Sequence, residues 1–593
     1  MDMKFCENIP EYADGDAACK DGRKERVAEM AGKINRICQK LVRYLGILFV
    51  GYLFLQGLFT MCCIQRVNER VYFISNNALP QLAGIVLFFL MTLFLVNSKR
   101  CLHFLEKYEN MLIAGSGILM LGFLVWWITN TRFWYDSDME KIYQYAGLML
   151  GGNYSGWMKG GYLYMYPHQN GLLLFVAFLL CFLSVDGSFL ALYYINLFFY
   201  IITIASLCFC LKMVYSDKSA RCVQGIMLIG FLPYGFFCMM LYGNVIGFGF
   251  ACAAMAAMLA YLKNAKAGWL GVSALCMTAA IIFKQNELIV FVGLVILLLF
   301  ECLMSAENRR KKAVLSFVYV AVVLLGIKAP DIIIKGITGI EVEGGSSRFS
   351  HLAMGLQYSD EGAPGWYNGF NANVFEAVGY DTEASAEVAK TALRESWTDF
   401  MQNPRKAWKF FNAKLASEWN NPTFECFNIQ NSRNTGLELS SFVKSTINDG
   451  GKVNILLTYL MDVGQSVLLF GILMYLIAAD KMDWKELLPL ILFIGGMIFF
   501  AFWEAKSQYV LPFFLLLVPY AFPGYQKLAE AVKNPRAGHK KLFAGMAVMG
   551  ALILLIAISD GQWVHDSFKI DQDTEKYYEY IHMYNKNFEN LRF

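Results

Sequence analysis

The sequence predicts an all-α polytopic membrane protein with about thirteen transmembrane helices, one juxtamembrane or re-entrant helix and a mostly α external domain. Its 593 residues are 57% hydrophobic, and the mean hydropathy is +0.42. Charged residues make up only 17%, against about 25% in ordinary globular domains. This composition excludes a disordered chain and a typical cytosolic enzyme. The net charge of +4 is too small to indicate a nucleic-acid partner.

Apolar runs give the order of the elements, because roughly 20 apolar residues cross a hydrocarbon core as a helix. The runs lie at 41–63, 79–97, 111–129, 170–184, 189–211, 222–241, 243–262, 269–283, 287–304, 313–330, 454–478, 487–503, 508–523 and 542–559. Residues 331–453 contain no such run and predict an external domain. Within it we expect helices over 384–402 and 404–419, separated at Asn403-Pro404. The charges on these helices, Lys414 among them, are interpreted as solvated faces, and the alternative is that a few of them contact a diphosphate or an acidic acceptor.

The distribution of lysine and arginine orients these segments, because cytoplasmic loops carry an excess of both. The basic segments are 1–40, 98–110, 212–221, 263–266, 305–312 and 524–541. We therefore expect a cytoplasmic N-terminus, transmembrane regions over 41–330 and 454–560, and an external tail over 561–593, in a bacterial plasma membrane. The loop 130–169 is then external. Two apolar runs, 170–184 and 189–211, separate this loop from the cytoplasmic segment 212–221, although an odd number of crossings is required. We therefore expect the run 170–184 not to cross.

Two carboxylates, Asp136 and Asp138, follow the run at 111–129 in this external loop. One interpretation is a helix N-cap, because Asp or Ser before a helix satisfies unpaired backbone amides. The other is a general base, since a carboxylate at the membrane surface accepts a proton from an acceptor hydroxyl. Asp136-Ser137-Asp138 also leaves a divalent-metal clamp open, although the sequence indicates no certain cofactor.

A second group of polar residues offers contacts for a donor or an acceptor. Tyr166, His168 and Gln169 provide hydrogen-bond donors and acceptors for a polar headgroup, the alternative being an ordinary interfacial aromatic belt. In the large domain, Arg348 and Trp366 are further candidates. A tryptophan flanked by Gly and Asn suits stacking on a sugar face, although such segments also form plain turns.

Two lysines lie in expected external hairpins that are far apart in the sequence. Lys284 follows the run at 269–283, and Lys506 precedes the run at 508–523. As point charges they are suited to a donor phosphate, and the alternative for each is an ion pair in an ordinary short loop. Glu504 and Tyr509 flank Lys506 and are candidates for binding the donor or the acceptor. The spacing alone does not show whether the two lysines converge.

The pattern of these segments resembles the GT-C glycosyltransferases, nearest to the family 39 type, which includes protein O-mannosyltransferases and lipid A aminoarabinose transferases. The resemblance covers roughly residues 111 to 560 and rests on four segments: Asp136-Ser137-Asp138, Tyr166-Pro167-His168-Gln169, Lys284, and the stretch from Trp503 to Pro512. The family often has Asp-Glu in the first loop, whereas two aspartates flank Ser137 here. Two additional N-terminal spans precede the part that resembles the family.

The resemblance implies inverting transfer of a sugar from a polyprenyl-phosphate donor to an acceptor hydroxyl on the external face. It implies Asp138 as the catalytic carboxylate, with Asp136 second, and Lys284 and Lys506 at the donor phosphate. The acceptor is a glycan, a lipid or a protein, and membrane lipids are the remaining partners. Two alternatives stay open: a polymerase or ligase of a lipid-linked glycan, and a membrane transporter or flippase, which would use the same polar residues as a path.

Overall fold

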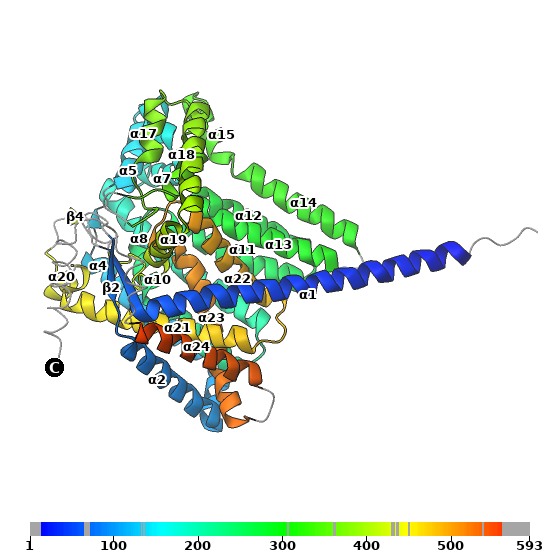
Figure 1. The fold of residues 1–593 in the computed structure, drawn as a ribbon. Helices are drawn as coiled ribbons and strands as arrows, with labels where there is room; N and C mark the ends of the chain where they lie inside the picture. The colour runs from blue at the N-terminus through cyan, green and yellow to red at the C-terminus, as the bar shows by residue number, and fades with distance from the viewer. Residues whose placement is uncertain are drawn as a thin grey trace, which may run out of the picture.

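The structure is a computed structural model of the whole chain. It describes residues 14–64, 71–131, 133–134, 137–304, 308–359, 363–427, 433–434, 438–448, 451–535 and 539–559. These residues form a nearly all-α fold, as the sequence predicts (Figure 1). Asp136 and the expected tail 561–593 lie outside the described residues.

Eleven helices of the described part are long and apolar enough to cross a membrane, which supports a multi-pass membrane protein. Two of these spans combine neighbouring elements, η4 (Gln285–Glu287) with α13 and α14 with α15. The helices that contribute are α1 (Asp14–Phe59), α2 (Ala78–Asn97), α4 (Glu109–Thr131), α8 (Val185–Val214), α11 (Asn244–Asn264), α13 (Leu288–Met304), α14 (Arg309–Gly326), α15 (Ala329–Thr338), α21 (Lys452–Ala478), α22 (Trp484–Phe502), α23 (Ser507–Lys533) and α24 (Lys540–Ile558).

The predicted count of about thirteen spans is not reproduced by helix length and composition in the described residues. The run 222–241 is a bent pair, α9 (Lys218–Ile229) and α10 (Leu232–Phe236) with the short turn after it, broken by 46°. Counting this pair as one span gives twelve. The helix α12 (Ala267–Phe283) has 17 residues, and α7 (Asn170–Leu180) has 11. At 1.5 Å per residue α7 is about 16 Å long, which is too short to cross.

A β-hairpin corrects the predicted end of the first span. The run 41–63 was expected to be helical throughout, but α1 ends at Phe59 and β1 (Thr60–Ile64) pairs antiparallel with β2 (Val71–Ser75). The strand β2, with Val71, Tyr72, Phe73 and Ile74, is rich in β-branched and aromatic residues, which favour a pleated surface. A second ladder joins β3 (Phe133–Trp134) to β4 (Arg433–Asn434), with Phe133 opposite Asn434. The fold is therefore not purely α.

The stretch 331–453 begins inside a helix, since α14 and α15 together form one candidate span over Arg309–Thr338. Its helices are α16 (Arg348–Gly355), α17 (Phe370–Ala377), α18 (Thr382–Gln402), α19 (Pro404–Trp419) and α20 (Ser441–Ile447). The two helices expected over 384–402 and 404–419 are confirmed, with the break at Asn403. However, α19 packs against α1, α22 and α23, and Trp419 and Phe424 join the core of the membrane helices.

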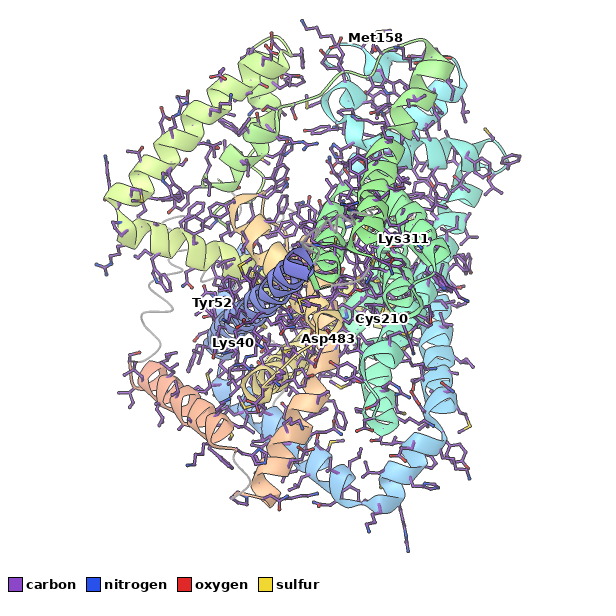
Figure 2. All side chains as sticks on the ribbon, turned by 90° about the vertical axis from the view of Figure 1, so that its right-hand side faces the viewer. Lys40, Tyr52, Met158, Cys210, Lys311 and Asp483 are labelled. Carbon is purple, nitrogen blue, oxygen red and sulfur yellow. The ribbon has the colours of Figure 1, made fainter. Side chains whose placement is uncertain are left out.

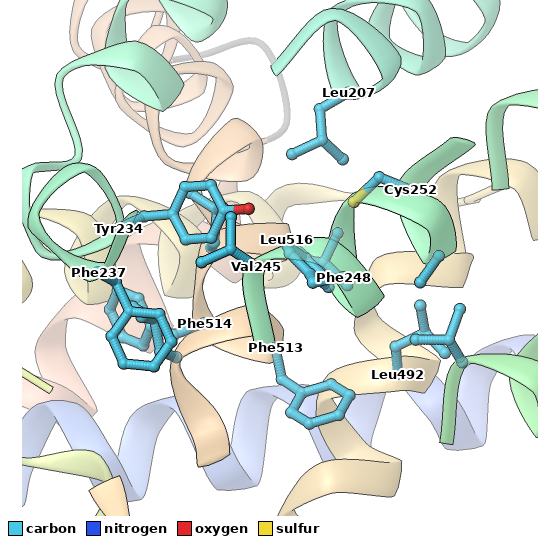
Figure 3. Close-up of a cluster of buried hydrophobic side chains, with 14 of the residues drawn as sticks. Leu207, Tyr234, Phe237, Val245, Phe248, Cys252, Leu492, Phe513, Phe514 and Leu516 are labelled. Atoms are coloured by element: carbon cyan, nitrogen blue, oxygen red, sulfur yellow. The ribbon is translucent and has the colours of Figure 1, made fainter. Parts of the chain in front are cut away.

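That core lies between α8, α10, α11, α22 and α23. Figure 3 shows part of it, with Tyr234, Phe248, Phe513 and Phe514 among the buried side chains. The ring planes of Tyr234 and Phe248 are at 79°, with centroids 5.9 Å apart, a favourable edge-to-face geometry. The close packing of α11 against α8 and α12 fixes the ends of these helices relative to one another.

The N-terminal part of α1 projects beyond the body of the molecule, and the end of α14 that begins at Arg309 points the same way (Figure 1). Figure 2 views the molecule from this side and labels Lys40 in α1 and Lys311 in α14. Two of the basic segments that were predicted to share one side of the membrane therefore lie at one end of the helices.

Candidate functional site

Asp138 lies in the first turn of α5 (Ser137–Leu150), a helix on the opposite side of the molecule from the projecting N-terminal part of α1 (Figure 1). The helix starts at Ser137, whose φ of 60° is uncommon for a residue with a side chain. Asp138 is exposed, and its Oδ2 accepts a hydrogen bond from the hydroxyl of Tyr242 at 3.3 Å. The carboxylate is thus both open to solvent and oriented by a neighbour.

Tyr242 connects Asp138 to two other predicted residues. The Gln169 side-chain amide donates to the Tyr242 hydroxyl, and Nε2 of Gln169 lies 3.1 Å from Nε2 of His168. Burial, followed by the charge of Asp138, raises the pKa of Tyr242 well above its usual value, so the phenol keeps its proton. A polar chain consequently runs from His168 through Gln169 and Tyr242 to the Asp138 carboxylate.

The backbone next to Tyr242 explains its position. Gly243 has a φ of +76°, and a Cβ there would lie 2.4 Å from the carbonyl oxygen of Phe283. Only glycine allows this close approach, which brings the start of α11 against the end of α12. Lys284 directly follows Phe283, so Tyr242 and Lys284 become neighbours.

Lys284 packs its ammonium against two aromatic rings. Its Nζ lies 4.2 Å from the ring centroid of Tyr242 and 5.6 Å from that of Tyr509, distances at which a cation is attracted to an aromatic face. The Lys284 ammonium makes no hydrogen bond or ion pair with the described residues. Burial lowers its pKa to about 8, although the charges of Asp138 and Glu504 act in the opposite direction.

Lys506 and Glu504 belong to the same neighbourhood. The charge of Lys506 contributes to lowering the pKa of Lys284, and the charge of Glu504 raises it. Both side chains have interactions of their own with the surrounding protein. Lys506 is the residue immediately before α23, and Ala505 next to it donates its backbone N–H to the carbonyl of Gly365 at 2.8 Å. The charge of Lys506 therefore acts on Lys284, although the two lysines are far apart in the sequence.

We call Asp138, Gln169, Tyr242, Lys284 and Tyr509 the Asp138 cluster. Its residues lie at the start of α5, in the short turn before α7, just before α11, just after α12 and in the first turn of α23. Residues that are distant in sequence therefore bring an acid, a phenol, a lysine and an aromatic face together.

Tyr166 borders this cluster. Its hydroxyl accepts a hydrogen bond of 3.4 Å from Asn371 in α17, and its ring centroid is 6.1 Å from that of His168. Burial raises its pKa, and the charges of Tyr367 and Asp138 add to the effect. The helix α17 of the large domain is thereby joined to the loop that carries His168.

The two remaining candidates of the large domain behave differently from each other. Trp366 is only 2% exposed, and its indole N–H donates to the Ser417 hydroxyl at 2.8 Å. Its ring fills the core beneath the domain and has no open face for stacking on a sugar. Arg348 begins α16 and is exposed, and its charge reaches His168.

Lys414 corrects the interpretation of α19 as a solvated face. The residue is fully buried, and its ammonium donates 2.6 Å hydrogen bonds to the carbonyls of Gly355 and Trp503. Burial lowers its pKa to about 8. Because Trp503 directly precedes Glu504, Lys414 fixes the segment that carries Glu504 and Lys506. His351 of α16 stacks on the Trp503 indole at 5.2 Å and reinforces this connection.

Among the described residues, no group of three or more His, Cys, Asp or Glu side chains could hold a metal ion. The clamp suggested by Asp136-Ser137-Asp138 stays a prediction, since Asp136 is outside the described residues. The described arrangement is suited to hold an anion with its lysines and to accept a proton with Asp138.

The sequence did not single out Tyr242. The only available signal was its place in the short gap between the runs 222–241 and 243–262, at the same expected side as Lys284. Comparison with models of known protein families gives no match for this chain, and comparison with curated protein sequences gives none either.

Proposed function

We propose that this protein is an integral-membrane glycosyltransferase of GT-C type that moves a sugar from a polyprenyl-phosphate donor to an acceptor hydroxyl. The carboxylate of Asp138 is the general base, and Lys284 with Lys506 neutralises the departing phosphate. The reaction takes place on the external side of a bacterial plasma membrane. The acceptor is a glycan, a lipid or a protein.

The bond changes of this reaction are simple. The acceptor oxygen attacks the anomeric carbon while its proton passes to Asp138 Oδ, and the bond from that carbon to the phosphate oxygen breaks. The electron pair leaves with the polyprenyl phosphate, whose charge increases as it departs. Cations placed where charge develops stabilise the transition state more than the ground state. Attack from the side opposite the phosphate inverts the anomeric centre.

The observation that supports this proposal is the arrangement around Tyr242. The hydroxyl of Tyr242 donates to Asp138, and its ring lies against the Lys284 ammonium. A single side chain therefore separates the acid from the cation, and a phosphate-linked sugar bound between them would contact both. Tyr509 and Tyr166 supply aromatic surface next to them, which suits a sugar ring and the first prenyl unit.

The proposal is tested with purified protein and a panel of polyprenyl-phosphate sugars, by following the consumption of each donor. Asp138→Asn keeps the size of the side chain and removes the base, and we expect transfer to fall by about 10²–10⁴-fold. Asp186→Asn is the matched control, because Asp186 also lies exposed in the first turn of a helix, α8. This control should retain full activity.

Two results would reject the proposal. Transfer by Asp138→Asn at the wild-type rate, with both variants folded, would remove the base from the mechanism. Failure of wild-type protein to consume any donor, combined with movement of a lipid-linked sugar across proteoliposomes, would instead favour a flippase.

A further inference from the structure

The helices α18 and α19 form a hairpin in the large domain that turns at Asn403. Six of the 21 residues of α18 are charged, and neither helix is among the candidate spans of the described part. The ring of Phe400 packs on that of Phe410 with centroids 4.9 Å apart, and Lys406 pairs with Asp399 at 2.6 Å. The hairpin is therefore held together by its own contacts, outside the candidate spans.

The hairpin lies across the direction of the spans. In Figure 1, α18 stands upright whereas α1 and α14 run across the picture, and it lies on the side away from the projecting part of α1. Figure 2 looks at the molecule from that projecting part. The yellow-green hairpin extends there beyond the other helices, with no described span in front of it. Because the bilayer surrounds the spans of a multi-pass membrane protein, a helix placed in this way lies over lipid.

Large apolar side chains are exposed around the turn of this hairpin. Trp397 is 50% exposed, Met401 67% and Trp408 51%. Trp397 and Met401 are four positions apart on α18 and share one face of the helix. Tryptophan is enriched where a membrane meets water, because its ring is apolar and its N–H is polar. These side chains are therefore suited to the boundary between headgroups and acyl chains.

The same part of the hairpin is basic. Residues 390–409 include five basic and two acidic side chains. Each exposed tryptophan has an arginine three positions before it, Arg394 for Trp397 and Arg405 for Trp408, and side chains at this spacing are neighbours on a helix. Neither arginine makes a hydrogen bond or ion pair through its side chain with the described residues. Both guanidinium groups are available to a phosphate.

We propose that the α18–α19 hairpin rests on the membrane interface and binds anionic phospholipids. Trp397, Met401 and Trp408 lie at the level between the headgroups and the acyl chains. Arg394 and Arg405 contact the lipid phosphates next to them. The occupant is the lipid of the bilayer that the protein spans, since the hairpin lies crosswise at the edge of the spans and combines exposed tryptophan with unpaired arginine.

This contact connects the bilayer to the segment before Glu504. The helix α19 runs from the exposed Trp408 to the buried Lys414, whose ammonium donates to the carbonyls of Gly355 and Trp503. The depth of the hairpin in the interface therefore sets the height of that segment above the bilayer. None of the residues that carry this proposal belongs to the Asp138 cluster, so it does not rest on the proposed function.

The test uses full-length protein in nanodiscs made of equal amounts of phosphatidylcholine and phosphatidylglycerol. The photoreactive residue p-benzoylphenylalanine takes the place of Trp397 or of Trp408, one position at a time, and preserves an aromatic side chain there. After irradiation, mass spectrometry of the digested protein should find phospholipid adducts at both positions. Phosphatidylglycerol should be enriched about fivefold over phosphatidylcholine among them, the effect of one basic residue at an anionic surface.

Two controls accompany this experiment. Val388 is 43% exposed and lies nine positions before Trp397, about two and a half turns, and so on the opposite side of α18. The photoreactive residue at position 388 should give no lipid adduct. Arg405→Gln, combined with the label at 408, should abolish the enrichment of phosphatidylglycerol while adducts with both lipids persist.

Several results would overturn the proposal. One is the absence of lipid adducts at 397 and 408, and another is an equal yield of lipid adducts at 388 and 397. Adducts with a second copy of the chain in place of lipid would identify the hairpin as an interface between copies. Unchanged enrichment in Arg405→Gln would overturn the assignment of Arg405 to the phosphate. Sugar transfer is not measured, so this proposal and the proposed function can fail independently.

Discussion

Lys284 and Lys414 both have a pKa lowered by burial, but their ammonium groups have different partners. Burial lowers the pKa of each to about 8. The ammonium of Lys414 is sealed from solvent and donates to two backbone carbonyls, whereas that of Lys284 rests on the rings of Tyr242 and Tyr509. Lys284 also faces the exposed carboxylate of Asp138 across Tyr242.

This difference distinguishes a structural lysine from one that is ready for a ligand. The Lys414 ammonium donates hydrogen bonds to the carbonyls of Gly355 and Trp503. These bonds join α19 to α16 and to the segment before Glu504, and they leave Lys414 with a structural role. Aromatic faces attract a cation without using its N–H donors, and Lys284 therefore keeps them for an incoming anion. The lowered pKa alone does not distinguish the two lysines, because it is about 8 for both.

The largest effect on activity in this comparison should come from Lys284→Met. We expect the rate of transfer to fall by about 10²–10³-fold, as when one electrostatic contact to a developing anion is removed. Folding should be unaffected, because Lys284 makes no hydrogen bond to the described residues that the change would break. Steady-state kinetics with a lipid-phosphate donor, together with thermal unfolding, measures both. A normal rate in Lys284→Met would place the phosphate elsewhere.

Tyr242→Phe should have the next largest effect. The change removes the hydroxyl that donates to Asp138 and accepts from Gln169 but keeps the ring beneath Lys284. A hydrogen bond to a charged group contributes about 1.5–3 kcal/mol, so the rate should fall about tenfold to a hundredfold. Because the cation–π contact remains, the donor KM should change little. An increase in KM at constant kcat would show that the Tyr242 hydroxyl contributes to donor binding and does not orient the Asp138 carboxylate.

The pH dependence should report on Lys284. With a pKa of about 8, Lys284 loses its charge as the pH rises through 8, and donor binding should weaken by about tenfold per pH unit above it. Lys284→Arg keeps the charge at all accessible pH values and should extend activity into the alkaline range. The measurement is kcat/KM from pH 6 to 10 for both proteins. Identical profiles would assign the alkaline limb to another group.

Lys414→Met should have the smallest effect on turnover and a clear effect on stability. It leaves the carbonyls of Gly355 and Trp503 without their donor, at a cost of about 1–3 kcal/mol. A lysine with a lowered pKa in the fold binds fewer protons than in the unfolded chain, so wild-type stability should rise from pH 8 toward 10. Thermal unfolding of Lys414→Met should show a weaker rise. A variant as stable as wild type at pH 7 would contradict the structural role.

Much of the helical order follows from the sequence, because long apolar runs and Pro404 are local signals. The sequence predicts that the helix continues through Thr60 to Cys63, where the structure has the strand β1, because an apolar run alone does not distinguish a buried strand from the end of a helix. The burial of Lys414 was missed for a different reason. Its partners, Gly355 and Trp503, are brought to α19 only by the tertiary fold.

The same holds for the candidate site. The residue types of Asp138, Lys284 and Lys506 pointed to their chemistry, because charges near a membrane surface are costly and usually functional. The approach of Lys284 to Asp138 across Tyr242 was not predictable, since it depends on the tight approach of Gly243 to Phe283 at the α11–α12 junction. Tyr242 was missed because a lone tyrosine at a membrane interface is most often part of an aromatic belt.

The most direct test is an experimental structure of Asp138→Asn with a polyprenyl-phosphate sugar bound. The substitution removes the base, so the donor should persist. Our account predicts a phosphate oxygen at about 2.7–2.9 Å from Lys284 Nζ, with the anomeric carbon facing residue 138. A phosphate bound elsewhere, with Lys284 still resting unliganded on Tyr242 and Tyr509, would contradict it.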